Sequence, residues 1–498
     1  MRKIAGHVIV GLWLSGTFGF AQSQPSTEES LEIKVQRLTD AMNQAQKQIE
    51  QSQRELDELR AQMTALQKQV VPTKPAEAEI DAASLSAAVE QIREQQALDQ
   101  TKIATHEQAK VESESKYPLK LSGLVLLTGF VNTKQVDDPV SPSIVLFGGG
   151  STGASLSQTV LGFDARGPHL FNAESHADLR IDFAGAALSN GNAASAYSGG
   201  LVRLRTAHAD LQWQHTQAFV ALDHTILSPN TPSSLTAVAV PALGWSGNLW
   251  TWNPQVGLTQ DIPLSTAQRF RIQAALIDVM NPVQIYGGAG SPTATVSVPT
   301  TAEMSRWPGA EGRLALLNGT ENTGFQFGVG GLFVPHRSIA GTPFNSWAGT
   351  LDYRIPFGKH IGVSGSGYWG EALGGLGGGA FKDYVIEPDP LSPTGYTFED
   401  LHAIGGWAQI KARANTRLEF NAAVGTDQVP ALELRPFAGI ASSYYLNLAR
   451  NLTYTGNVIY SPSAYLLFSL EYRHLQSAPV NDYSASGDVI GIATGYRF

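Results

Sequence analysis

Seven arginines stand in segments where polar and apolar residues alternate. Arg180 lies between Leu179 and Ile181, and comparable spacing recurs at Arg203, Arg205, Arg271, Arg313, Arg354 and Arg473. Alternation in an extended strand places each arginine on the face opposite its apolar neighbours. Guanidinium groups bind carboxylates through two parallel hydrogen bonds, so a row of them on one face suits recognition of organic acids.

Acidic residues share the face of these arginines, which leaves two roles open. The counter-charges are Asp164, Asp178, Asp182 and Asp352. One role is a structural network of arginines and aspartates that stiffens a wall. The other is a basic stripe that acts on solutes. The structural role is favoured for any single arginine, whereas a basic stripe is favoured for the cluster Arg180, Arg203 and Arg205, on adjacent strands.

The strands that position these residues are best seen between Glu174 and Phe183. Five ionisable residues of this segment share one face, and Leu179 and Ile181 lie on the other. Because no soluble core would bury five ionisable groups, the polar face must meet water. An arginine on a lipid-facing surface would cost roughly 2–4 kcal/mol at the bilayer midplane. The arginines are therefore predicted to face a water-filled interior.

Similar segments recur throughout residues 117–498 and end on the aromatic residue Phe498. We expect an all-β transmembrane barrel of about sixteen antiparallel strands, with eighteen as the alternative if residues 436–448 contain two more. Long linkers follow the odd-numbered strands and short linkers the even-numbered ones, as in outer-membrane barrels. An even number of strands places both chain ends on the periplasmic side.

One long linker, residues 227–250, carries the tryptophans Trp245 and Trp250. By position it is the third outer loop, which folds into the lumen in general porins. Two roles for the tryptophans stay open. They stack on solutes at a constriction, or they belong to an aromatic girdle at the membrane surface.

The N-terminal part has a different composition. Residues 1–21 are typical of a cleavable signal peptide, with Arg2 and Lys3 before an apolar run and Ala21 at the cleavage site. Residues 22–71 are predicted to form an α-helical coiled coil, and residues 72–116 a proline hinge and a second, weaker helix. The heptad seam comprises Leu31, Val35, Leu38, Met42, Ile49, Leu56, Leu59, Met63, Leu66 and Val70. So narrow a seam predicts a homo-oligomer, with a trimer as the best guess.

Composition and motifs exclude several classes of function. The 498-residue chain has no cysteine and a formal net charge of −9. It contains no HExxH, GxSxG or phosphate-loop motif, and its histidines are scattered along strands. We therefore expect no enzymatic activity, no catalytic residues, no cofactor, no metal site and no nucleic-acid partner.

Several short stretches resemble the DcaP-like trimeric porins. They are Leu201–Asp210, Pro254–Thr259, Ala274–Asp278 before Asn281-Pro282, and Asn457–Pro462 with Leu470–Tyr472. The matches are short and spread over the predicted barrel. The resemblance implies a periplasmic coiled coil followed by a sixteen-stranded barrel that passes small anionic organic acids.

Together these features predict an outer-membrane porin that passes small hydrophilic solutes and favours anions such as carboxylates and dicarboxylates. The expected partners are outer-membrane lipids, further copies of the chain, small anionic solutes and, through the periplasmic arm, peptidoglycan. Two alternatives stay open: a general non-selective porin, and a structural tether between the outer membrane and the cell wall. A helix of roughly 40 residues would give an arm of about 60 Å. The identity of the solute does not follow from the sequence.

Overall fold

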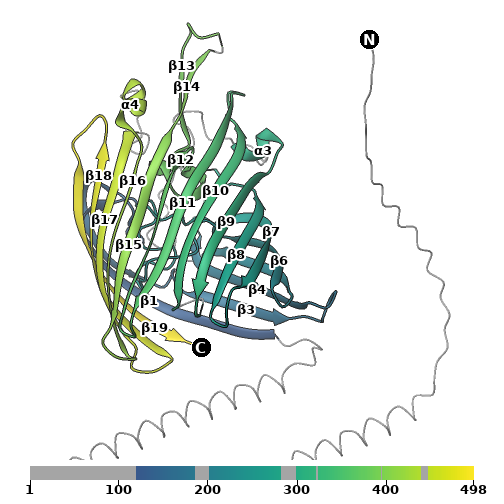
Figure 1. Cartoon of the computed structure of the whole chain (residues 1–498). Helices are drawn as coiled ribbons and strands as arrows, with labels where there is room; N and C mark the ends of the chain where they lie inside the picture. The colour runs from purple at the N-terminus through teal and green to yellow at the C-terminus, as the bar shows by residue number, and fades with distance from the viewer. Residues whose placement is uncertain (1–118, 186–200, 282–298, 321–322, 394, 439–446) are drawn as a thin grey trace, which may run out of the picture. The chain divides into compact units, whose positions relative to one another are not determined.

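The computed structural model describes residues 119–185, 201–281, 299–320, 323–393, 395–438 and 447–498. These residues form a closed barrel of antiparallel strands (Figure 1). The barrel closes where β1 (Leu119–Val136) pairs with β19 (Ala485–Arg497), with Leu124 opposite Arg497. Closure removes the edge strands, so the wall satisfies its own backbone donors and acceptors as a bilayer requires.

The strands follow one another around the wall in chain order. After β1 come β2 (Val145–Ser155), β3 (Val160–Arg166), β4 (Glu174–Gly185), β5 (Leu201–Gln212), β6 (Thr216–Asp223), β7 (Asn253–Pro263), β8 (Gln268–Ile277), β9 (Gly309–Asn318), β10 (Phe325–Arg337), β11 (Pro343–Phe357), β12 (Ile361–Glu371), β15 (His402–Arg413), β16 (Leu418–Gln428), β17 (Leu448–Tyr460), β18 (Leu466–Pro479) and β19. A separate hairpin, β13 (Tyr384–Pro388) and β14 (Tyr396–Asp400), stands outside the wall. Among the described residues, no helix is long and apolar enough to cross a membrane.

The second wall strand is interrupted. Both β2 and β3 pair with β1: Ser155 lies opposite Thr128, and Val160 lies opposite Leu124. The residues between them form a break within a single course of the wall. Counted in this way the barrel has sixteen strands, which confirms the prediction. The N-terminal half of this strand, β2, was not expected, because its run of three glycines at Gly148–Gly150 is typical of a loop.

The two ends of the barrel differ. Short turns lie at the end that holds the C-terminus, and glycines with positive φ angles close two of them, Gly319 (+87°) and Gly358 (+68°). The other end carries longer segments, including α3 (Thr301–Ser305), α4 (Ala431–Leu434) and the β13–β14 hairpin (Figure 1). The predicted alternation of linker length is not strict. Strands β10 and β18 extend further than expected, so only residues 338–342 and 480–484 separate them from the next strands.

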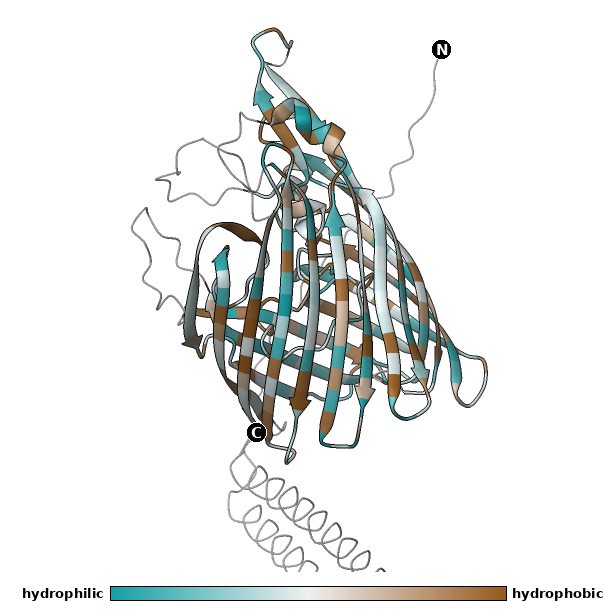
Figure 2. Cartoon of the chain, turned by 90° about the vertical axis from the view of Figure 1, so that its left-hand side faces the viewer, coloured by the Kyte–Doolittle hydropathy of each residue, from teal (hydrophilic) through white to brown (hydrophobic). Residues whose placement is uncertain are grey.

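Apolar and polar residues alternate along the strands of the wall (Figure 2). In β18 the exposed Leu466, Phe468 and Leu470 alternate with residues that are buried in the barrel, such as Glu471 and Arg473. The outward apolar surface matches what lipid would cover, and the inward surface carries the charges. Strand alternation alone was sufficient to predict both faces.

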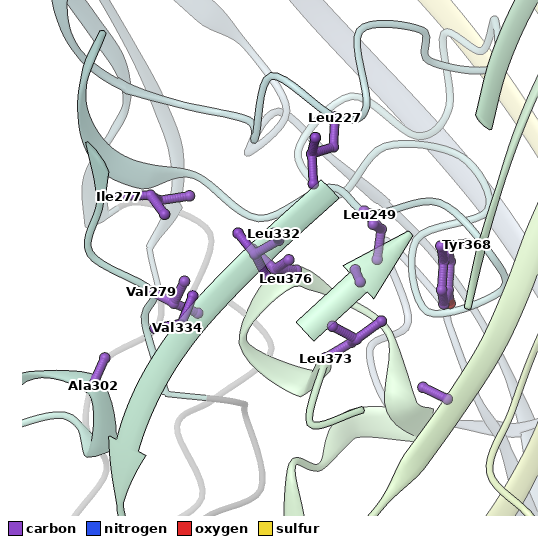
Figure 3. Packing of buried hydrophobic residues seen from close by; sticks show 12 residues of the cluster. Leu227, Leu249, Ile277, Val279, Ala302, Leu332, Val334, Tyr368, Leu373 and Leu376 are labelled. Atoms are coloured by element: carbon purple, nitrogen blue, oxygen red, sulfur yellow. The ribbon is translucent and has the colours of Figure 1, made fainter. Parts of the chain in front are cut away.

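The loop end of the lumen contains an apolar cluster (Figure 3). Leu373 and Leu376, from the segment that includes the short 3-10 helices η1 (Gly374–Leu376) and η2 (Gly379–Phe381), pack there against Leu332 and Val334 of β10. Leu249, from the linker between β6 and β7, joins the same cluster. Two chain segments are thus packed into the barrel from its loop end.

The predicted signal peptide (1–21), coiled coil (22–71) and second helix (72–116) lie outside the described residues, as does the whole heptad seam. They stay predictions. The alternative of eighteen strands would have placed two more within residues 436–448, but β16 pairs directly with β17 and the wall closes with sixteen. Before residues 439–446, which lie outside the described part, the chain forms α4 and a short 3-10 helix, η3 (Arg435–Phe437).

Candidate functional site

The linker between β6 and β7, residues 224–252, lies inside the barrel, and we call it the inner loop. Its backbone and side chains form hydrogen bonds to wall residues spread around the circumference. They are Glu311 on β9, Tyr353 on β11, Gln409 on β15, Asn457 on β17, Glu471 on β18 and Gln158 between β2 and β3. The inner loop therefore narrows the lumen, as its position in the sequence suggested.

Trp245 and Trp250 anchor the end of the inner loop. Trp245 stacks on Phe381 with ring centroids 4.0 Å apart, and Trp250 meets the edge of Trp245 at 5.7 Å. Only 3% and 8% of the two residues are exposed, within an apolar cluster that also contains Val385 and Leu401. This packing explains both tryptophans as anchors of the loop, rather than as platforms for solutes or as a membrane girdle.

Two arginines of the predicted stripe share one carboxylate. Arg203 contacts the buried Asp182 at two points, with Nε–Oδ1 at 3.0 Å and Nη2–Oδ2 at 2.7 Å. Arg205 reaches the same carboxylate with Nη1 at 3.4 Å from Oδ2. The two guanidinium groups carry two positive charges against a single negative one. This cluster therefore keeps a net positive charge.

The inner loop fixes the same two arginines from the other side. Arg205 donates to the carbonyl of Val238 at 2.7 Å, and Arg203 donates to that of Ala239 at 2.9 Å. Both guanidinium carbons also lie over the ring of Trp252, at 5.0 and 5.1 Å from its centroid. Carbonyl dipoles and the ring face orient the two cations without neutralising them.

A register shift in β5 accompanies this arrangement. Thr206 lies opposite Arg180 and Leu204 lies opposite Ile181, so Arg205 is an extra residue on its strand. Such bulges redirect a side chain at the cost of one ladder pairing. Simple alternation predicted that Arg203 and Arg205 share a face, and both contact Asp182, but the structure achieves this with a bulge.

The third arginine of the stripe is part of a longer chain of charges. Arg180 Nη2 lies 2.5 Å from Asp164 Oδ1, and its Nη1 lies 3.6 Å from Asp178 Oδ1. His208 bridges Asp178 and Asp223, with its ring nitrogens 3.1 and 2.8 Å from the carboxylate oxygens. Here carboxylates outnumber arginines, so Arg180 does not extend the positive cluster of Arg203 and Arg205.

Two other predicted arginines make two-point contacts with aspartates. Arg313 contacts Asp352 with both distances at 2.8 Å, and it donates to Gln273 at 2.7 Å. Arg271 makes a similar contact with Asp261, at 2.7 and 2.8 Å, and it shares that carboxylate with Arg269, whose Nε lies 3.2 Å from Oδ2. Asp261 was not among the predicted counter-charges, although its position directly opposite Arg271 on the neighbouring strand could have indicated it.

The last two predicted arginines contact the inner loop. Arg473 pairs with Glu471 at 2.5 Å and donates to Thr236 of the inner loop at 2.8 Å. Arg354 donates to the side chain of Asn230, also in the inner loop. The structure thus distributes the seven arginines among several clusters around the lumen, rather than along one stripe.

The inner-loop residues Pro229 and Thr231 line two cavities that differ in charge. A cavity of about 380 Å³ has a lining of both signs, with Asp178, Asp210 and Asp223 together with Arg271 and Arg313. A second cavity has a volume of about 500 Å³. We call it the basic cavity, because its lining includes Arg354, Lys359, His360, Lys411 and Arg413. Sequence reasoning missed Lys411 and Arg413, although both alternate with apolar residues on β15 as the predicted arginines do.

Buried ionisable groups hold the second segment that enters the barrel. Lys382 Nζ donates to the carbonyls of Ala380 and Leu448 at 2.7 and 2.6 Å, and burial lowers the pKa of this lysine to about 7. Burial raises the pKa of the neighbouring Asp383 to about 7. Both groups are deprived of water by the packing of residues 372–383 in the loop end of the barrel.

Comparison with known proteins identifies a solved structure with a similar fold. No family model matches the chain, and no curated protein matches it by sequence. The outer membrane channel DcaP of Acinetobacter baumannii matches in structure with a TM-score of 0.57 and 13% identity, over 78% of this chain and 99% of that one. The chain has the fold of the DcaP channel. The resemblance inferred from short motifs is confirmed at the level of the fold.

Weaker structural matches accompany DcaP. An anion-selective porin from Comamonas acidovorans has a TM-score of 0.47 and 11% identity, over 77% of this chain and 100% of that one. OmpF of Salmonella typhi has a TM-score of 0.46 and 12% identity, over 76% and 98%. At 13% identity even DcaP supports the architecture alone, so the solute has to be inferred from the residues of this lumen.

Proposed function

We propose that the protein is an outer-membrane porin for small hydrophilic solutes, with a preference for anions such as carboxylates. The observation that carries the proposal is the cluster in which Arg203 and Arg205 share the single carboxylate of Asp182 beside the inner loop. Confined water screens charge less than bulk water, so an uncompensated positive charge there attracts anions and repels cations.

The expected selectivity is a preference and not an exclusion. Arg313 is paired with Asp352, Arg271 shares Asp261 with Arg269, and Arg180 lies among several carboxylates. The carboxylates beside these arginines reduce the positive field that a passing ion meets. Paired arginines of this kind also suit the alternative, a general porin with weak selectivity. That alternative would become the leading proposal if removal of the Arg203–Arg205 cluster left the ratio of anion to cation permeability unchanged.

Reconstitution of the full-length protein in planar bilayers tests this proposal. Under a salt gradient, we expect a reversal potential that indicates higher anion than cation permeability, together with block by small dicarboxylates. A cation-selective or unselective wild-type channel would contradict the anion preference. A protein that forms no channel in bilayers would contradict the porin function itself.

We further propose that the protein works as a homo-oligomer, with a trimer as the first expectation, in the cell outer membrane. The support comes from the outward apolar surface of the barrel and from the heptad seam in residues 22–71, which would place an arm in the periplasm within reach of peptidoglycan. Chemical cross-linking of the wild type should give a discrete oligomer. A monomer would remove the support for the coiled coil.

A further inference from the structure

The basic cavity lies at the short-turn end of the lumen. Gly358, Lys359 and His360, which line it, form the turn between β11 and β12, and Arg413 ends β15 at the same end of the barrel. The inner-loop segment from Pro229 to Ser233 forms its opposite side. In a porin this end faces the periplasm. A solute that has passed the inner loop meets this cavity before it leaves the channel.

Positive charge dominates the lining of the basic cavity. Arg354, Lys359, Lys411 and Arg413 contribute four permanent cations, and none of the described residues that line it is an aspartate or glutamate. The carboxylate of Glu419 lies behind two of them, 3.1 Å from Lys411 Nζ and 3.2 Å from Arg413 Nε. Among the described residues, cations therefore outnumber carboxylates around this volume.

Neutral groups orient the polar side chains of the cavity. Asn230 of the inner loop accepts from Arg354, and the amide of Gln409 accepts from the backbone N–H of Ser233 at 2.6 Å. Both of these contacts join neutral groups to the lining, unlike the contact of Arg313 with the carboxylate of Asp352. The cavity therefore has prepositioned donors and an excess of cations, which are the two requirements of an anion site.

The size and charge of the cavity indicate the class of ligand. About 500 Å³ is within the usual range of small-molecule sites, so a compact organic ion has room. Coulomb attraction grows in proportion to the charge of the ligand, and a lining with an excess of cations therefore discriminates between one and several negative charges. Arginine and lysine both bind oxygen anions, whether the oxygens belong to carboxylates or to phosphates.

We propose that the basic cavity is a binding site for small oxyanions with two or more negative charges, distinct from the Arg203–Arg205 cluster. It retains such ions at the periplasmic exit of the lumen, while singly charged anions pass with little delay. The shared chemistry of the ligand is a compact group of anionic oxygens, as in polycarboxylates and phosphates. This inference goes beyond the proposed anion preference, because it assigns a separate site built from residues that the selectivity cluster does not use.

The test uses the full-length channel in planar bilayers, with citrate, inorganic phosphate or acetate added to one side at a time. We expect citrate and phosphate to reduce current at lower concentrations from the short-turn side than from the loop side. Acetate should require far higher concentrations. Block by only one of the two multivalent anions would support the site and identify the preferred oxygens. Block that is equal for acetate and citrate, or equal from both sides, would overturn the proposal.

Three single substitutions make the test specific. Lys359→Gln, in an exposed turn, should weaken citrate block by roughly threefold to tenfold. Glu419→Gln removes the carboxylate that contacts Lys411 and Arg413 and should strengthen block by a similar factor. Lys120→Gln is the matched control, because it removes one cation from β1 at the same end of the barrel but outside the cavity lining. It should change block by less than about twofold.

Opposite effects of Lys359→Gln and Glu419→Gln cannot arise from unfolding, and each variant should still show the heat-dependent gel mobility of a folded barrel. Equal effects of Lys359→Gln and Lys120→Gln would mean that general surface charge, and not the cavity, causes the block. Failure of the anion preference is separable, because replacement of Arg203 and Arg205 should alter the reversal potential and leave the side-dependent citrate block in place.

Discussion

Two arginine–aspartate contacts in the lumen have the same chemistry but different stoichiometry. Arg313 pairs one to one with Asp352, and their side chains are only 3% and 1% exposed. Arg203 and Arg205 share Asp182 and keep 27% and 15% of their side chains exposed. A matched, buried pair produces little net field, whereas two arginines on one carboxylate leave an excess of positive charge. Arg269 and Arg271 share Asp261 in the same ratio, so what sets the proposed filter apart is its contact with the inner loop as well as its stoichiometry.

Replacement of Arg313 by alanine should give the largest effect on stability. It would leave the carboxylate of Asp352 buried without its charged partner, which costs about 3–5 kcal/mol. Gln326 alone would then donate to that carboxylate, at 2.6 Å. We expect a lower urea midpoint for barrel unfolding and little change in ion selectivity of the molecules that remain folded.

The paired variant Arg313→Met with Asp352→Leu is the control for that prediction. Because it removes both charges together, it should recover much of the lost stability. If Arg313→Ala unfolded at the wild-type midpoint but altered the reversal potential, Arg313 would act on permeating ions and not on the stability of the wall, which contradicts the prediction.

Removal of the Trp245 side chain should loosen the inner loop without opening the wall. The ring stacks on Phe381 inside an apolar cluster, and truncation of a buried tryptophan costs about 3 kcal/mol or more. The expected result of Trp245→Ala is larger current fluctuation in single-channel recordings, with barrel unfolding nearly unchanged. Quiet channels with wild-type conductance would show that the anchor is dispensable.

The packing of residues 372–383 should be weakest near pH 7. The pKa of Asp383 is raised to about 7, so its contribution to stability is lost as pH rises from about 4 to 7. The pKa of Lys382 is lowered to about 7, so the cost of its burial is present below pH 7 and disappears as pH rises toward 10. Each slope is at most about 1.4 kcal/mol per pH unit.

Amide hydrogen exchange in residues 372–383, corrected for intrinsic rates, measures these two slopes. Asp383→Asn should abolish the decrease in protection on the acid side, and Lys382→Met should abolish the increase on the alkaline side. Protection that is flat with pH in the wild type would show that neither group titrates in the folded barrel.

Most of the barrel could be predicted from the sequence because alternation is a local property. The alternation of Leu466, Phe468 and Leu470 with polar residues such as Glu471 predicts which side chains of β18 face outward and which inward, without any knowledge of neighbouring strands. Local patterns also explain why one segment of the wall was missed. The glycines Gly148–Gly150 carry no side chains, so β2 shows no alternation, and only its pairing with β1 reveals it.

The candidate site was less predictable because it depends on contacts between distant segments. Alternation assigned Arg203 to a polar face, but not the sharing of Asp182 with Arg205, which requires the bulge in β5. The burial of Trp245 depends on Phe381, more than a hundred residues away in the chain. The basic cavity likewise exists only because the inner loop passes close to the ends of β11 and β15.

The most direct measurement is the reversal potential of two double variants in the same salt gradient. Arg203→Ala with Arg205→Ala removes two cations that share one carboxylate, whereas Arg313→Gln with Asp352→Asn removes a one-to-one pair and leaves the net charge unchanged. We predict that the first variant loses anion preference by roughly threefold to tenfold in permeability ratio, and that the second stays close to the wild type. Equal reversal potentials in the two variants would contradict the claim that unmatched arginines form the filter.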